Sequence, residues 1–147
     1  MNTKNFLIGG IVGGVVFFLL GWLFYGNLMA NYFHEHPGTA TNVDRLMDQF
    51  EWWALALGNL LTGFLIAYVF AKSGVATLAS GLITGGILGF LMSSSIDLIM
   101  YGTTNILSKH GLVADIATFT VMAAIAGAVV GAINGMLNRT TVTTAKV

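Results

Sequence analysis

Four long apolar segments separated by polar connections dominate the pattern of this chain. They cover residues 5–29, 52–71, 75–101 and 112–137. At about 1.5 Å of rise per helical residue, each segment is long enough to cross roughly 30 Å of hydrocarbon. The pattern therefore predicts an all-α fold, a single membrane domain over residues 1–147 that is built as a bundle of four transmembrane helices.

The connection between the first two spans, residues 31–51, is the largest polar stretch. A helix start is indicated at Thr41, because Asp44 follows three residues later as in a capping box. Apolar residues recur at helical spacing at Val43, Leu46, Met47 and Phe50. We predict a short amphipathic helix here that lies at the membrane surface in the first outer loop.

Small and polar side chains share one row of the third span. Positions four apart are neighbours along a helix, and this row reads Gly81, Gly85, Gly89, Ser93, Asp97 and Tyr101. Its glycine half allows another helix to approach closely, and its second half carries a hydroxyl, a carboxyl and a phenol. The row is predicted to be a packing surface at one end and a chemical surface at the other.

The glycines also predict a register between the third and fourth spans. Antiparallel pairing matches Gly81 with Gly135, Gly85 with Gly131 and Gly89 with Gly127. That register puts Ser108 at the tip of the connection and Asp97 level with Phe119. It also sets Tyr101 level with Asp115, and we predict a hydrogen bond between these two side chains.

The cations predict which way the chain crosses the membrane. One side holds Lys4, Lys72, Arg139 and Lys146, and the other side holds Arg45 and Lys109. Because cytoplasmic loops carry the excess of Lys and Arg, both termini are expected in the cytoplasm. The glycine clusters lie in the cytoplasmic halves of the spans, whereas acids and histidines gather at the outer ends. We expect helices crowded at the inner end and splayed at the outer end, which leaves an outward-facing vestibule.

Composition narrows the function classes. Of the 147 residues, 56% are hydrophobic and 8% are charged, whereas about a quarter are charged in soluble domains. The net charge of zero offers no basic field to nucleic acid. The absence of cysteine excludes disulfides and thiolate chemistry. The first apolar segment is too long for a signal peptide and is expected to remain as a span.

The candidate ligand-binding residues are centred on Asp97. A carboxylate inside a span costs roughly 2.5 to 3.5 kcal/mol at the helix centre, so Asp97 is expected to face inward and to hold a cation, a proton or a ligand amine. The alternative is that it reaches outer water from a position near the helix end. The other predicted ligand-binding residues are Tyr101, Ser93, Ser94, Asp115, Asn59, Tyr25 and Trp22.

These other residues also have structural interpretations. Asp115 suits the positive start of a helix as an ordinary first-turn acid. Asn59 is of a type that often forms hydrogen bonds between helices. Trp22 and Tyr25 are expected in the aromatic belt of a membrane interface whether or not they bind a ligand.

His34 and His36 form a candidate metal site, because alternate residues of an extended loop project two imidazoles to one side. Two ligands do not complete a zinc site. Pro37 and Gly38 follow and indicate a turn, so a solvated loop is the alternative. No cofactor is predicted.

Short motifs relate the chain to other small membrane proteins. The run Gly21-Trp22-Leu23-Phe24-Tyr25-Gly26 closes the first span, and Gly58-Asn59 lies in the second. With the polar loop and the further spans, these residues resemble a family of small bacterial four-helix integral membrane proteins of unknown function. The resemblance implies an inner-membrane location and no activity. Gly58-Asn59 is also similar to a span of small fluoride channels, but Ser93-Ser94-Ser95-Ile96-Asp97 stands where those channels carry a Phe and Thr/Ser box.

Phosphate-binding loops, catalytic triads and catalytic carboxylate pairs are missing from the sequence, so we predict a protein that is not an enzyme. The leading hypothesis is a multi-pass protein of the bacterial inner membrane that binds a small ligand or cation in the outward vestibule and acts as a transporter or channel. Its partners would be the lipid bilayer and further copies of itself, in a dimer or larger homo-oligomer. The alternatives are a structural or accessory subunit that assembles through glycine-rich helix faces, and a metal-dependent membrane enzyme.

Overall fold

The computed structural model describes residues 3–144, and their side chains as far as Asn138. The named elements in this part of the chain are all helical. They are α1 (Thr3–Leu23), η1 (Phe24–Leu28), α2 (Ala30–Glu35), η2 (Met47–Gln49), α3 (Trp52–Ser73), α4 (Leu78–Thr103) and α5 (Lys109–Thr144). Four stretches are long and apolar enough to cross a membrane: Thr3–Leu28, Trp52–Ser73, Leu78–Thr103 and Lys109–Asn138. The predicted all-helical fold with four helices that could span a membrane is thereby confirmed.

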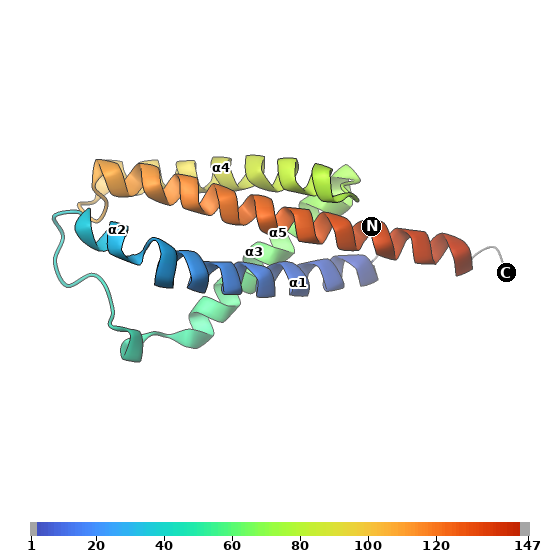
Figure 1. Cartoon of the computed structure of the whole chain (residues 1–147), viewed down its shortest axis with the longest axis horizontal. Coiled ribbons are helices and arrows are strands. Elements are labelled where there is room, and N and C mark those ends of the chain that lie inside the picture. Colours follow the sequence, from blue (N-terminus) through green and yellow to red (C-terminus); the bar gives the residue numbers. More distant parts are fainter. Residues whose placement is uncertain (1–2, 145–147) are drawn as a thin grey trace.

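The four long helices form two antiparallel pairs. Helix α4 packs against α5 and α1 packs against α3, while α1 joins the two pairs through α5. Helix α3 runs obliquely behind α1 and touches α4 and α5 much less (Figure 1). We call the end that holds the start of α1 and the α3–α4 turn the turn end, and the end that holds α2, η2 and the α4–α5 connection the loop end.

The predicted cytoplasmic position of the termini depends partly on residues at the C-terminal end of the chain. Lys146 and the side chain of Arg139 lie outside the described part of the structure. The orientation of the chain in the membrane therefore stays a prediction.

Glycines set the closest helix contacts, and these lie toward the turn end. A Cβ added at Gly63 of α3 would overlap the backbone of Gly14 in α1, and one added at Gly81 of α4 would overlap the backbone of Gly127 in α5. The buried residues of α4 are Gly81, Gly85, Gly89, Ser93 and Asp97. The row of positions four apart is thus confirmed as the face of α4 that packs against another helix.

The register between α4 and α5 differs from the predicted one by about one turn. Gly81 faces Gly127 and Gly131, whereas Gly135 faces Ala76. The reason is the connection: α4 ends at Thr103 and α5 begins at Lys109, so its midpoint falls at residue 106 and not at Ser108. In the observed register, residues 97 and 115 stand at the same level.

The hydrophobic core lies between the cavity described below and the turn end. Its buried members come from α1, α3, the α3–α4 turn and α5: Phe17, Ile66, Phe70, Val75, Met122, Ala123, Ala126 and Val130. Beyond it, the buried side chain of Asn134 donates a hydrogen bond to the Val75 carbonyl oxygen at 3.3 Å. Gly74 adopts a left-handed φ of 70° at the end of α3, a conformation that glycine supplies without steric cost.

The predicted amphipathic helix of the first loop is absent, and this prediction was wrong. Residues 41–46 have no helical structure, and only the 3-10 turn Met47–Gln49 forms. Asn42 has a left-handed φ of 58°, which interrupts a right-handed helix that starts at Thr41. A helix of this length gains too few hydrogen bonds to repay nucleation unless it packs on something, and residues 41–50 are exposed. A short helix forms earlier instead, at Ala30–Glu35.

Candidate functional site

Two carboxyl groups meet where α4 faces α5. Asp97 is only 6% exposed, because it occupies the buried row of α4. The Asp115 carboxyl on α5 lies within hydrogen-bonding reach of Asp97. Two carboxylates this close repel each other strongly in a medium of low dielectric constant. The pair is therefore a place where a proton or another cation is stabilised.

Tyr25 brings α1 to the same pair, since its phenol lies close enough to the Asp115 carboxyl to interact with it. Its position depends on a π-helical turn, Phe24–Leu28, in which the Met29 amide donates to the Phe24 carbonyl oxygen at 2.7 Å. The side chain of Asn27 donates to the Trp22 carbonyl oxygen at 2.9 Å and so satisfies a carbonyl group next to this turn. Single π turns inside helices often occur at functional sites.

Hydroxyl groups surround the carboxyl pair on the α4 side. Oγ of Ser93 and of Ser94 and Oδ2 of Asp97 are buried and have no hydrogen-bond partner. Buried polar atoms normally have partners, so three free atoms on neighbouring turns indicate a ligand or water that binds there. Thr118 on α5, one turn after Asp115, is a further buried polar residue.

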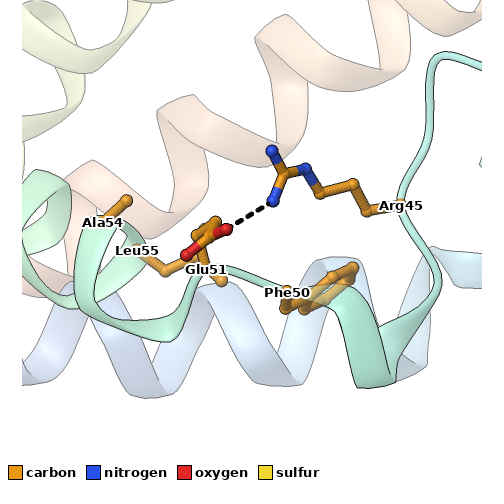
Figure 2. Close-up of a pocket in the computed structure, with 5 residues that line it drawn as sticks. All are labelled: Arg45, Phe50, Glu51, Ala54 and Leu55. Atoms are coloured by element: carbon orange, nitrogen blue, oxygen red, sulfur yellow. Dashed lines mark hydrogen bonds and ion pairs between the residues drawn. The ribbon is translucent and has the colours of Figure 1, made fainter.

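The described residues give this pair no basic partner. Neither Asp97 nor Asp115 takes part in a salt bridge with a described residue. Arg45, a cation of the loop end, is instead paired with Glu51 at 2.9 Å (Figure 2). It also donates to the Gln49 carbonyl oxygen at 3.3 Å. The negative charge of the carboxyl pair is thus not balanced by a described basic side chain, and a bound proton or cation can balance it.

A cavity of about 560 Å³ opens beside this pair, between α1, α3 and α5 at the loop end. It exists because α3 crosses α1 obliquely at Gly63 and diverges from it: residues 52–58 are exposed. The lining is mostly aromatic and apolar, and comprises Phe18, Gly21, Trp22, Tyr25, Gly26, Ala30, Met47, Phe50, Trp52, Leu55, Asn59, Phe119 and Met122. Tyr25 belongs to both the cavity and the carboxyl pair, and Phe119 lies one turn after Asp115.

The first loop is fastened to the α4–α5 connection. The backbone amides of Thr39 and Ala40 donate to the Asn105 carbonyl oxygen at 2.9 and 3.0 Å. The Ser108 hydroxyl donates to the His36 carbonyl oxygen at 2.6 Å. These contacts cover the part of the loop end that lies next to α4 and α5. The cavity therefore lies on the other side of the loop end, next to α3.

The predicted metal pair does not have the expected geometry. His34 lies in α2 and His36 is the residue that ends this helix, so the two are not alternate residues of an extended loop. The ring of His36 instead stacks on Tyr32 at 4.3 Å and neighbours His110 at 5.3 Å between centroids. No group of three or more potential metal ligands exists among the described residues.

The predicted site residues thus fall into two adjoining groups. Ser93, Ser94, Asp97 and Asp115 form the carboxyl pair and its hydroxyl surroundings, while Trp22, Tyr25 and Asn59 line the cavity. The predicted hydrogen bond between Tyr101 and Asp115 is not formed: Asp115 interacts with Tyr25 and Asp97, and Tyr101 is only half-buried. The shifted register explains the difference, because it moves Asp115 from the level of Tyr101 to that of Asp97.

Sequence reasoning missed several lining residues, among them Phe18, Phe50, Phe119 and Met122. In the sequence each looks like an ordinary apolar residue of a span or loop. Whether its side chain faces a cavity depends on how α3 crosses α1. Trp52 was the one further lining residue with a signal, because it starts a span as an interfacial aromatic residue.

Comparison with protein-family profiles, with curated proteins and with solved structures finds no match to this chain. The chemistry of the site therefore has to be argued from its own residues.

Proposed function

We propose that this protein is a non-enzymatic, multi-pass protein of the bacterial inner membrane that binds a small cation or cationic ligand at its loop end. With both termini in the cytoplasm, as the distribution of cations predicts, the cavity faces outward. The observation that carries the proposal is the pair Asp97 and Asp115, which lies next to the cavity with Asp97 buried and with no basic partner among the described residues. An ionisable residue inside a span that faces the interior of a bundle commonly marks a substrate or ion pathway.

The main alternative is a structural or accessory subunit. Residues 52–58 at the start of α3 are exposed, and they offer an apolar surface to another helix. The glycine rows do not support this alternative in the way the sequence suggested, since Gly10, Gly63, Gly81 and Gly127 are covered by helices of their own chain. Because these glycines are covered within the chain, they offer no surface to a second copy, and a homo-oligomer stays a proposal.

Ligand-dependent stabilisation of the purified protein tests the proposal. Thermal unfolding would be measured against a panel of inorganic cations and small organic molecules, for the unmodified chain, Asp97→Asn and Asp44→Asn. Asp44 is an exposed acid of the first loop and provides the matched control. We expect at least one cation to raise the midpoint of the unmodified chain and of Asp44→Asn, but not of Asp97→Asn. Equal responses of all three proteins to every compound would refute a binding role for Asp97.

A further inference from the structure

The cavity and the carboxyl pair together define the class of ligand more narrowly than their separate features do. Ligand pockets are typically about 300 to 1,000 Å³ with a largely apolar and aromatic lining, and this cavity measures about 560 Å³. It is large enough for an organic molecule with a ring or several alkyl groups. Its side chains decide what charge that molecule carries.

Six aromatic side chains line the cavity: Phe18, Trp22, Tyr25, Phe50, Trp52 and Phe119. The face of an aromatic ring is negative and attracts organic cations, most strongly where water is excluded. The described residues of the lining include no Lys, Arg or His. Tyr25 adds a second attraction, because its ring lines the cavity while its phenol approaches Asp115.

An inorganic ion fits this cavity poorly. Hard cations such as Ca²⁺ take about six to eight oxygen ligands, whereas Tyr25 and Asn59 are the only described lining residues whose side chains carry an oxygen atom. The amide nitrogen of Asn59 donates to the Leu55 carbonyl oxygen at 2.8 Å, so a single amide oxygen and a phenol are available. A bare ion inside the cavity would lose most of its hydration shell without replacement by the lining, to which Asp97 and Asp115 do not belong, whereas an organic cation presents apolar surface to the rings.

A phospholipid head group is also disfavoured, because its phosphate would lack a partner. Arg45, a basic side chain of the loop end, is already paired with Glu51 (Figure 2). An ammonium group without an attached phosphate suits the site better.

We propose that the cavity binds a free organic ammonium ion that carries an aromatic or branched alkyl group, with its charge toward Tyr25 and Asp115. Asp97 lies behind Asp115 with its unpartnered neighbours Ser93 and Ser94, and the repulsion between the two carboxyl groups makes a bound cation more favourable. This inference rests on the proposed function and specifies its ligand class.

The test compares benzyltrimethylammonium with its uncharged carbon isostere, neopentylbenzene. Both would be titrated into the full chain in phosphatidylglycerol nanodiscs, with tryptophan fluorescence as the readout, since Trp22 and Trp52 line the cavity. We expect the cation to bind at least about tenfold more tightly than the isostere, a difference within the range of a desolvated cation–π contact and an ion pair. Asp115→Asn should remove this difference and leave the affinity for the isostere unchanged, which also shows that the variant is folded. Asp44→Asn should behave as the unmodified chain.

Other results overturn the inference in distinguishable ways. Equal affinity for the cation and the isostere would show an apolar cavity without charge selection. Stabilisation by inorganic ions alone, lost in Asp97→Asn, would leave the proposed function in place and refute the organic ligand. A large loss of affinity for both compounds in phosphatidylcholine nanodiscs would assign the cavity to a choline head group of the bilayer, since the change of surface charge alone affects only the cation. Absence of any cation-dependent effect would refute both the inference and the proposed function.

Discussion

Adding one methyl group at two adjacent glycines of α4 should have opposite effects on stability. A Cβ added at Gly85 would overlap the carbonyl oxygen of Ala123 and lie 2.9 Å from Cα of Gly127, whereas a Cβ added at Gly86 would meet only Cβ of Ala124, at 3.5 Å. Ordinary contact begins at 3.4 Å, so Gly85→Ala is about 0.5 Å too close to a backbone atom, which cannot rotate away.

The difference in stability between Gly85→Ala and Gly86→Ala follows from three contributions. Both substitutions gain helix propensity, by up to about 1 kcal/mol. Gly85→Ala also forces α4 and α5 apart, and a gap of 0.5 Å or more loses about a quarter of the dispersion attraction for each contact affected. With a typical overpacking cost of about 1 to 3 kcal/mol, we expect Gly85→Ala to destabilise the protein and Gly86→Ala to leave it unchanged or slightly more stable.

Equilibrium unfolding measures this contrast directly. Far-UV circular dichroism would follow the loss of helix as dodecyl sulfate replaces maltoside in mixed micelles. A lower midpoint for Gly85→Ala than for Gly86→Ala supports the observed register of α4 and α5. Equal midpoints would show that the two glycines are equally covered and that the packing described for α4 is wrong.

Further outcomes concern the site. Asp97→Asn should stabilise the unliganded protein by about 1 to 3 kcal/mol in the same unfolding assay, because it removes a buried charge next to Asp115; Asp44→Asn should not. Tyr25→Phe should weaken binding of benzyltrimethylammonium by a factor of about three to ten in fluorescence titrations, because it keeps the ring and removes the phenol that interacts with the Asp115 carboxylate and favours its charged form. Binding should strengthen as pH rises, because protons compete with the ligand for the carboxylate oxygens, and titrations at several pH values would show the opposite trend if the carboxyl groups bind the ligand in their neutral form. The chain has no cysteine, so Ser73→Cys and Asp44→Cys report orientation: a membrane-impermeant thiol reagent applied to intact cells should label only the second.

The buried row of α4 was predictable because it depends on one helix alone. Residues four apart share a face wherever the helix goes, and a row that begins with three glycines has an obvious use in close packing. The four spans were predictable for the same reason, since length and apolar composition decide them.

Relations between helices were less predictable. The register of α4 and α5 depends on where two helices end, and an error of two residues in the tip of the connection moved Asp115 by one turn. The π turn at Phe24–Leu28 is a local change of helix geometry with no clear sequence signature, yet it accompanies the contact of Tyr25 with Asp115. The cavity depends on the oblique path of α3, which follows from the contact between Gly63 and Gly14.

The core beneath the cavity determines what happens to a bound molecule. Phe17, Ile66 and Met122 are each at most 2% exposed, and they close the space between α1, α3 and α5 below the aromatic rings. A ligand that enters from the loop end therefore reaches a dead end. In this conformation the cavity is closed toward the turn end, so passage of a ligand to the opposite leaflet would require the packing of these three side chains to open.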